Sequence, residues 1–220
     1  RVYDEAHVEI TRAGTAAQPI TLRGAGVAQS ILSGRITFRP GAAYWIIEDL
    51  AVDMTGEAKE DAIRANPDVH HLTFRRLHVR NGSMYGIRLE NGVADVLIEQ
   101  CDIGHFVNSG TDAHGIGLQV VSNVTVRGCY LHHNSGDGVQ SHTSDFPGSG
   151  QWASNILIEG NRIDANGENG VDIKSTHGIT VRANTLAGYR EAGGGEGIAI
   201  EVQYDAQDVL ITGNRIFVYP

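Results

Sequence analysis

The sequence predicts an all-β protein whose single chain winds into a right-handed parallel β-helix, a solenoid of stacked coils. Two observations predict this fold: short β-branched segments recur along the chain, and the segments between them are rich in Gly and Asn without helical periodicity. Repeats of this length are too small to bury an apolar face alone, so they must stack. The right-handed winding follows from the chirality of parallel strand connections.

One repeated template has apolar residues at both ends and Leu, Cys or Asn at its fourth position. Its copies are FRRLHV (74–79), IEQCDI (98–103), VRGCYL (126–131), IEGNRI (158–163), VRANTL (181–186) and ITGNRI (211–216). The fourth residues are 24, 28, 32, 23 and 30 positions apart, as loops of variable length on a fixed coil would give. We therefore expect these fourth residues to stack as an internal ladder, in which Cys101 and Cys129 have a structural role.

A second template lies between these copies and consists of Gly followed by alternating apolar and polar residues. Its copies are YGIRLE (85–90), HGIGLQ (114–119), DGVQSH (137–142), NGVDIK (169–174) and EGIAIE (196–201), with DAIRAN (61–66) as a looser match. Alternate residues of a strand face opposite sides, so the apolar residues face the core. The residues expected to face outward include Arg64, Arg88, Gln119, Gln140, His142, Asp172, Lys174 and Glu201.

The stacking of these strands predicts a polar stripe on one side of the coil. We expect His142, Lys174 and Glu201 to form one column, with Gln140 and Asp172 beside it, because neighbouring strands lie about 4.8 Å apart. Residues just before each glycine, among them Asp137, add to the stripe.

The loop after the stripe's central strand is longer than its counterpart one coil later. Gly138 and Ile158 are 20 residues apart, whereas Gly170 and Val181 are 11 apart. The insertion, residues 143–152, carries Phe146 and Trp152, whose aromatic faces suit the apolar side of a sugar ring. The alternative is that these aromatic residues only hold their own loop in place.

Composition limits the function classes. The formal net charge of −9 and the absence of a basic run disfavour nucleic acid and anionic membranes, and no apolar run is long enough to insert into a membrane. We expect one β-helix domain over residues 1–220, trimmed at one or both ends because no polar cap is evident. We also expect a secreted, periplasmic or cell-surface location with any leader removed; the oligomeric state is left open.

Lys174 is the strongest candidate for a catalytic residue. A lysine beside a bound uronic acid can remove the proton next to the sugar carboxylate and so start β-elimination. Its pKa, about 10.4 when unperturbed, must then be lowered by burial or by positive charge such as that of Arg64 or Arg88. The alternative is a surface ion pair of Lys174 with Asp172 or Glu201.

The other polar residues of the stripe have predicted roles around this lysine. Calcium is the expected cofactor, because carboxylate oxygens are its preferred ligands; the alternative is that the acidic residues are only solvated. His142 would donate a proton to the leaving oxygen, and Arg88 would bind the sugar carboxylate by a bidentate contact. Arg64, Gln119, Gln140 and Trp152 are expected to contact substrate, and the expected metal ligands are Asp137, Asp172 and Glu201.

The repeats over about residues 20–216 resemble the right-handed parallel β-helix proteins of the pectate lyase superfamily. The segment ENGVDIKSTHGITVRANTL (168–186) is similar to a segment of the chondroitin- and alginate-lyase family, and this resemblance places Lys174 on that family's catalytic lysine. That family has an arginine on the next coil, where this chain has Glu201. NSGDGVQ (134–140) is similar to a calcium-binding segment of another pectate lyase group, with Gly136 and Gln140 replacing two of its acids.

These observations predict a polysaccharide lyase that cleaves an acidic polysaccharide, such as pectate or alginate, by β-elimination. One alternative is a non-catalytic β-helix that binds glycans or acts as an adhesion module through the same stripe. Another is a glycoside hydrolase that uses a carboxylate pair such as Asp137 and Asp172.

Overall fold

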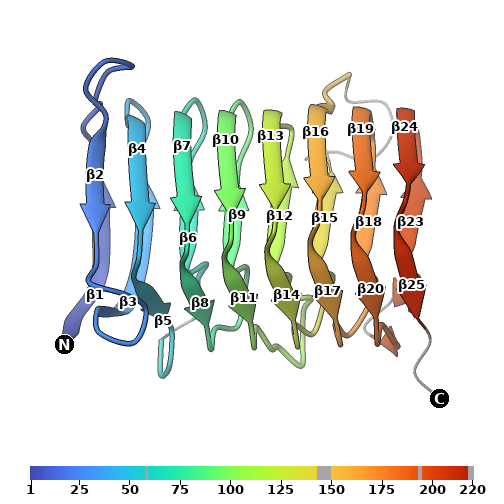
Figure 1. The fold of residues 1–220 in the computed structure, drawn as a ribbon, viewed down its shortest axis with the longest axis horizontal. Coiled ribbons are helices and arrows are strands. Elements are labelled where there is room, and N and C mark those ends of the chain that lie inside the picture. The colour runs from blue at the N-terminus through green and yellow to red at the C-terminus, as the bar shows by residue number, and fades with distance from the viewer. Residues whose placement is uncertain (58, 143–149, 193–194, 218–220) are drawn as a thin grey trace.

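The computed structural model describes residues 1–57, 59–142, 150–192 and 195–217. These residues form an all-β parallel solenoid of about seven turns, as the repeats predict. Figure 1 shows the coils stacked along the long axis of the molecule, with the N- and C-termini at opposite ends of the stack. Within the described ranges, no helix has the length and apolar character needed to span a membrane.

Each coil contributes one strand to each of three parallel faces. The first face consists of β6 (Ile63–Ala65), β9 (Ile87–Leu89), β12 (Ile116–Gln119), β15 (Val139–His142), β18 (Val171–Lys174) and β23 (Ile200–Gln203). The second face consists of β2 (Ile20–Arg23), β4 (Ala43–Glu48), β7 (His70–Arg75), β10 (Ala94–Glu99), β13 (Ser122–Arg127), β16 (Ala153–Glu159), β19 (Thr176–Arg182) and β24 (Gln207–Thr212). The third face consists of β5 (Ala51–Asp53), β8 (His78–Arg80), β11 (Asp102–Gly104), β14 (Tyr130–His132), β17 (Arg162–Asp164), β20 (Thr185–Ala187) and β25 (Arg215–Phe217).

Two N-terminal strands connect the first and third faces. β3 (Ile31–Phe38) pairs with β5 through its first half and with β6 through its second half, and β1 (Val2–Ile10) pairs with β3. Gly34 lies between the two halves of β3 with a φ of 128°, a conformation that glycine adopts without steric cost. A short antiparallel pair, β21 (Glu191–Ala192) and β22 (Gly195–Glu196), lies in the loop before β23.

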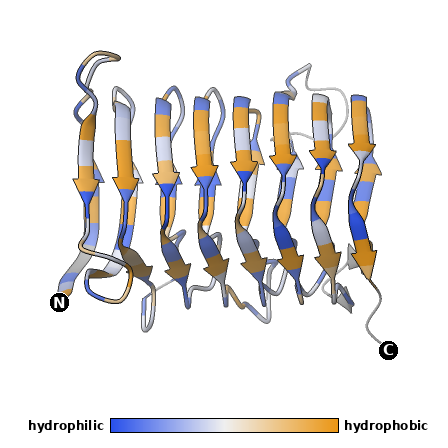
Figure 2. Ribbon diagram, in the orientation of Figure 1, coloured by the Kyte–Doolittle hydropathy of each residue, from blue (hydrophilic) through white to orange (hydrophobic). Residues whose placement is uncertain are grey.

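The core runs through the middle of the coils as stacked apolar side chains. On the first face the predicted inward residues Ile87, Leu89, Ile116 and Leu118 are fully buried. Figure 2 shows the apolar bands recurring at the same level in successive coils. Each buried aliphatic side chain of this size contributes about 1.5–3 kcal/mol to the free energy of unfolding, so the stacking of coils supplies most of the stability.

The internal ladder predicted from the first template is confirmed. Its positions are Leu77, Cys101, Cys129, Asn161, Asn184 and Asn214. Cys101 and Cys129 are buried and free, and no disulfide joins them. The backbone N–H of Cys129 donates to Oδ1 of Asn161 (2.8 Å), whose own N–H donates to Oδ1 of Asn184 (2.9 Å). The asparagines therefore satisfy buried backbone groups at successive turns.

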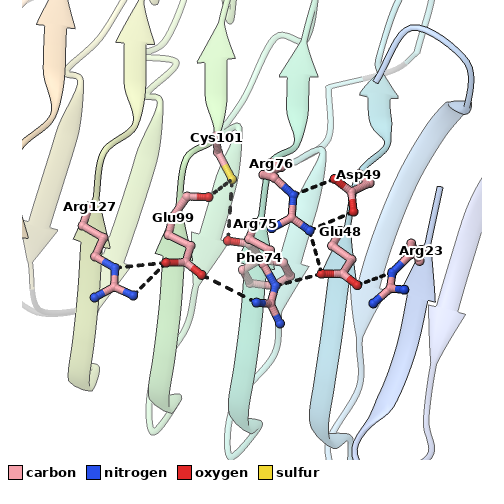
Figure 3. A network of polar contacts seen from close by, with 9 residues as sticks. All are labelled: Arg23, Glu48, Asp49, Phe74, Arg75, Arg76, Glu99, Cys101 and Arg127. Carbon is pink, nitrogen blue, oxygen red and sulfur yellow. Dashed lines mark hydrogen bonds and ion pairs between the residues drawn. The ribbon is translucent and has the colours of Figure 1, made fainter. Parts of the chain in front are cut away.

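A row of alternating charges follows the second face from coil to coil. The paired residues are Arg23, Glu48, Arg75, Glu99, Arg127, Glu159 and Arg182. Figure 3 shows the first five of them in contact, with Arg76 bound to Glu48 and Asp49 bound to Arg76. Burial alone would raise the pKa of Glu48, but its contacts with Arg23, Arg75 and Arg76 outweigh that effect and lower it.

One predicted register on the first face is wrong. The sequence templates place Glu201 beside Lys174, whereas the structure pairs Glu201 with Asp172 and Lys174 with Gln203. All four side chains lie on the expected side of the sheet, because the difference is two residues and the side-chain period of a strand is two.

The physical reason for this difference is the position of a small residue. The template aligns Gly197 with Gly170, but the N–H of Val171 bonds to the carbonyl of Ala199 (3.0 Å), so Ala199 takes the equivalent position. Ile198, which the template assigns to the core, therefore lies in the turn before the strand.

Candidate functional site

The first face carries every predicted site residue except Asp137, which lies just before β15, and Trp152, which lies between β15 and β16. One outward row runs through Arg64, Arg88, Gly117, Gln140, Asp172 and Glu201. In the next outward row Gln119 pairs with His142, and Lys174 pairs with Gln203. His142 and Lys174 are the last residues of the neighbouring strands β15 and β18, so the structure places the predicted proton donor and base on adjacent coils.

The N-terminal half of this face carries two arginines that are paired with acids: Asp61 and Glu90 each lie no more than 3.9 Å from both Arg64 and Arg88. Arg64 Nη2 donates to Glu90 Oε1 (2.5 Å), and Arg88 Nη2 donates to the side-chain oxygen of Gln119 (3.2 Å). The Arg88 guanidinium also lies over the ring of Tyr85, 5.1 Å from its centroid. Arg64 and Arg88 remain 35% and 24% exposed, so part of each side chain is accessible to solvent although both are ion-paired.

A ladder of polar side chains precedes the strands of this face. It consists of Asp61, Tyr85, His114, Asp137 and Asn169. Oδ1 of Asp61 accepts a hydrogen bond from the N–H of Tyr85 (3.1 Å), and Oδ1 of Asp137 accepts one from the N–H of Asn169 (2.9 Å). Because each of these acceptors satisfies a backbone donor of the next coil, the ladder has a fixed geometry.

Glycine follows Tyr85, His114, Asp137 and Asn169 in this ladder, whereas Ala62 follows Asp61. A Cβ on Gly115 would lie 2.6 Å from the carbonyl oxygen of Gly138, and a Cβ on Gly138 would lie 2.7 Å from that of Gly170. At Gly115 and Gly138 a side chain would therefore collide with the backbone of the next coil, and glycine lets the two coils approach.

His114 is buried at the centre of the ladder. Its Nδ1 accepts a hydrogen bond from the N–H of Asp137 (2.8 Å), which leaves the ring proton of the neutral imidazole on Nε2. The Tyr85 ring packs against it with a centroid separation of 5.0 Å. Burial, more than any neighbouring charge, raises the pKa of Tyr85.

The C-terminal half of the face is acidic and largely buried. Asp137, Glu168 and Asp172 are 1%, 4% and 1% exposed. Burial, together with the charges of Asp137 and Asp112, raises the pKa of Glu168 to about 7. Burial and then the charge of Asp137 raise the pKa of Asp172 to about 6. Glu168 and Asp172 can therefore exchange protons near neutral pH.

Lys174 contacts one of these acids directly. Its Nζ lies 2.6 Å from Oδ2 of Asp172. Burial alone would lower the pKa of Lys174, but the hydrogen bond and charge of Asp172, with the charge of Asp137, outweigh burial and raise it. The lysine is therefore protonated while Asp172 carries its charge, as the ion-pair interpretation expects.

The predicted calcium ligands can be compared with the chemistry of calcium. Asp172 and Glu201 pair on adjacent strands, and all three ligands, including Asp137, offer carboxylate oxygens. Oδ1 of Asp172 is buried without a hydrogen-bond partner, as an oxygen that awaits a cation would be. Asp137, Asp172 and Glu201 do not, however, form a group whose ligand atoms all lie within 4.8 Å of one another, so the donor chemistry suits calcium but the geometry does not bring the three ligands together.

Two residues of this half were not predicted from the sequence, Asp112 and Glu168. With His114 they form a group whose ligand atoms lie within 4.8 Å of one another. The backbone N–H of Glu168 donates to the carbonyl of Gly136 on the preceding coil (3.4 Å). The sequence signal for Asp112 is the Asp-Ala-His spacing, which puts both side chains on one side of an extended segment.

Trp152 is held at the border of the face by other residues. Its ring stacks on His177 at 4.4 Å, and Nε1 donates to Oδ2 of Asp205 (2.5 Å). These contacts match the alternative in which the residue fixes its own loop, although 38% of Trp152 remains exposed. The predicted partner Phe146 lies outside the described residues.

Gln140 is bound within the site, where it donates to Oδ2 of Asp137 (3.1 Å).

The stacked coils and the polar first face define a parallel β-helix protein with a candidate site along one strand row. Residues 61–218 match the family described as the right-handed β-helix region. The match covers more than half of the chain, so the protein belongs to that family. No curated protein sequence matches the chain.

Solved structures share this fold at low sequence identity. Pectate lyase Pel9A has a TM-score of 0.56 at 15% identity, covering 98% of this chain and 69% of the lyase. The T265N mutant of the periplasmic alginate epimerase AlgG has a TM-score of 0.68 at 15% identity, covering 96% and 47%. The A-module of the Azotobacter vinelandii mannuronan C-5 epimerase AlgE4 has a TM-score of 0.61 at 20% identity, covering 94% and 66%. The chain thus spans less than half of the AlgG structure.

Proposed function

We propose that the protein is a carbohydrate-active enzyme of the polysaccharide lyase type, which cleaves an acidic polysaccharide such as pectate or alginate by β-elimination. The observation that carries this proposal is the juxtaposition, on and beside one face, of two partly exposed arginines and buried carboxyl groups with raised pKa values. The similar structures named for pectate lyase and alginate epimerase support the substrate class. Such polymers lie outside the cytoplasm, so we propose a secreted, periplasmic or cell-surface location.

The residues have separate roles in this proposal. Arg88, assisted by Arg64, binds the uronate carboxylate and stabilises the charge that develops there after proton removal. Lys174 removes the proton next to that carboxylate, and His142 on the adjacent coil donates a proton to the leaving oxygen. Glu168, with a pKa of about 7, is a further group able to supply that proton.

Calcium is the proposed cofactor, held by Asp137, Asp172 and Glu201. When bound it would supply positive charge that attracts the uronate and neutralises these carboxylates. The hydrogen bond and charge of Asp172 are the main causes that raise the pKa of Lys174. With that charge neutralised, Lys174 loses its proton more readily, which resolves the conflict between its ion pair and its role as base.

The test is an ultraviolet assay of the unsaturated sugar end that β-elimination leaves, with polyuronates as substrates in calcium or in chelator. We expect product from the wild type and a decrease of about 100-fold or more in Lys174→Ala. Lys59→Ala is the matched control, since Lys59 is the only other lysine and is exposed in a loop.

The other outcomes distinguish the alternatives. Retention on immobilised polyuronate without product would replace this proposal by a glycan-binding module. Reducing ends without ultraviolet absorbance would indicate a hydrolase, and inverted uronate residues in an uncut polymer would indicate an epimerase. Equal product from the wild type and Lys174→Ala would exclude the lysine as base.

A further inference from the structure

Three histidines meet where strands of the third face end. His132 is the last residue of β14, His133 follows it, and His105 directly follows β11 on the preceding coil. The N–H of His105 donates to the carbonyl of His132 (3.2 Å), so the coils are in direct contact at this point. This cluster is separate from the predicted stripe, and no role in the proposed function involves it.

The backbone conformation brings these rings together. Adjacent residues of a regular strand face opposite sides, so the sequence does not predict His132 and His133 as a pair. His133 has a φ of 54° and His105 a φ of 62°, both in the left-handed region, and this interrupts the alternation at the strand ends. Asn81 holds the equivalent position one coil earlier with a φ of 64°.

The resulting geometry is that of a metal site. One ring nitrogen from each histidine lies within 4.8 Å of the other two. The ring centroids are 5.0 to 5.2 Å apart, and Nδ1 of His132 lies 2.8 Å from Nδ1 of His133. In a tetrahedral zinc site with Zn–N bonds of 2.0–2.1 Å, ligand nitrogens are about 3.3 Å apart, so a small ring rotation suffices.

The central ring is held in place by residues that are not ligands. Nε2 of His132 lies 2.9 Å from Oδ1 of Asp102, which accepts a hydrogen bond from it. Tyr130 stacks on the ring at 4.0 Å. A Cβ on Gly104 would lie 2.6 Å from Cε1 of His132, so only glycine leaves room for the ring here. A carboxylate behind a ligating imidazole is the usual support of such ligands, because it fixes the tautomer and raises basicity.

A change of tautomer at His133 can free the ring nitrogens for a metal ion while both imidazoles stay neutral. With the proton of His132 on Nε2, its Nδ1 presents a lone pair, and the 2.8 Å contact is a hydrogen bond donated by His133. A neutral imidazole carries its proton on either nitrogen. Transfer of the His133 proton to its Nε2 frees both Nδ1 atoms, and a cation can then occupy the space between the three rings.

We propose that His105, His132 and His133 form a binding site for a divalent transition metal ion, with zinc as the reference ion. Three imidazole donors favour zinc, copper and nickel, whereas calcium and magnesium prefer oxygen. His105 and His133 are exposed, so water completes the coordination and the site is open to solvent. The site is independent of the proposed calcium ligands in donor type and in position on the fold.

A second histidine pair in the same molecule provides an internal control. Nδ1 of His70 lies 2.7 Å from Nδ1 of His71, and His71 has a φ of 55°. In the part of the chain that the structure describes, no third His, Cys, Asp or Glu completes a group of ligands there. Oδ2 of Asp95 lies 3.5 Å from Nδ1 of His71, but the three residues do not form a group whose ligand atoms all lie within 4.8 Å of one another. The pair therefore matches His132 and His133 in its N–N contact without a complete set of three ligands.

The test is titration of zinc into chelator-treated protein by calorimetry, with the visible spectrum of bound cobalt(II) as a second measurement. The variants are His105→Asn and His133→Asn, since asparagine tolerates the left-handed conformation and occurs at Asn81. The controls are His71→Asn and Glu168→Gln, which remove the histidine pair and the other carboxylate-containing cluster. Folding of each variant is checked by its melting temperature in chelator.

We expect one zinc-binding event that both control variants retain and that His105→Asn and His133→Asn each remove. Asp102→Asn should weaken that event by about 10–100-fold while the cobalt spectrum keeps the same bands. The proposal is overturned if the wild type takes up no zinc, if both ligand variants bind zinc as the wild type does, or if His71→Asn removes the event. Displacement of zinc by equimolar calcium would also contradict the imidazole assignment.

Discussion

Buried carboxyl groups make the first face sensitive to pH. The pKa of Glu168 is about 7 in the folded chain against 4.5 as its ordinary value. Between these values the folded state binds more protons than the unfolded state, so the free energy of unfolding decreases as pH rises through this window. Above pH 7 the full penalty of a buried charge remains.

Glu168→Gln should therefore stabilise the protein at pH 8 and have little effect at pH 4. We expect the free energy of unfolding at pH 8 to rise by about 1–3 kcal/mol, because the amide carries no charge to bury. Urea unfolding in chelator at both pH values measures this, with Glu57→Gln as a control on the loop after β5. A variant less stable than the wild type at pH 8 would show that the Glu168 carboxylate makes a net favourable interaction.

For single residues, the sequence predicts the side of the strand that a residue faces more reliably than it predicts which residue lies beside it on the next coil. Alternation put Arg88, Asp172 and Lys174 on the outer surface without any knowledge of the coil. The neighbour of Glu201 depended on which small residue, Gly197 or Ala199, meets the preceding coil. Which of the two residues meets the preceding coil depends on the path of the turn, and a turn has no periodic sequence pattern from which to predict it.

Ladders of side chains join one strand to the next at the scale of the element. Asn161 shows how one amide serves several coils: Oδ1 accepts from the N–H of Cys129 (2.8 Å), and Nδ2 donates to the carbonyl of Val126 (3.0 Å). It is 2% exposed, so water cannot replace these partners. The template predicted this ladder because its fourth position lies in the same place in every coil.

Asn161→Ala should lower the free energy of unfolding by about 2–4 kcal/mol, since it leaves buried backbone groups without partners. Asn161→Cys should cost less, because a thiol occupies the equivalent position at Cys129 in the preceding coil. Denaturant unfolding of the three proteins measures both differences. Equal losses for Ala and Cys would mean that the lost volume, and not the lost acceptor, determines the cost.

The residues of the candidate site that lie in loops could not be placed from the sequence. Asp112 and Glu168 lie between strands of the third and first faces, where no alternation fixes a direction. The histidine cluster depends on the left-handed conformation of His133, which reverses the orientation that a regular strand implies. Sequence periodicity therefore predicts the strands and their outer rows, whereas the turn residues required the structure.

At the scale of the whole molecule, stability depends on contacts between neighbouring coils. Central coils are covered on both sides, whereas β24 and β25 are covered on one side in this chain, and Leu210, Ile211, Ile216 and Phe217 are 44–54% exposed. Stacked repeats open from the less covered coils first.

Amide hydrogen exchange should accordingly be slowest in β10, β13 and β16 and fastest in β24 on the second face. All four strands belong to one parallel sheet, in which β10, β13 and β16 are paired on both sides and β24 on one, so the difference reports the effect of position in the stack. Mass spectrometry of peptic fragments measures the rates. Uniform protection of β13 and β24 would show that the solenoid opens as one cooperative unit.

The alternating charge row of the second face has a consequence for how such a chain can change length. Arg75 and Arg127 stand on either side of Glu99, and Glu159 follows them. Removal of one coil, residues 94–121, would bring Arg75 against Arg127, whereas removal of two coils, residues 94–153, would bring Arg75 against Glu159. Deletion of an odd number of coils therefore brings like charges together, whereas deletion of an even number keeps opposite charges paired. The row therefore imposes a parity on the solenoid, so that coils are gained or lost most easily in pairs.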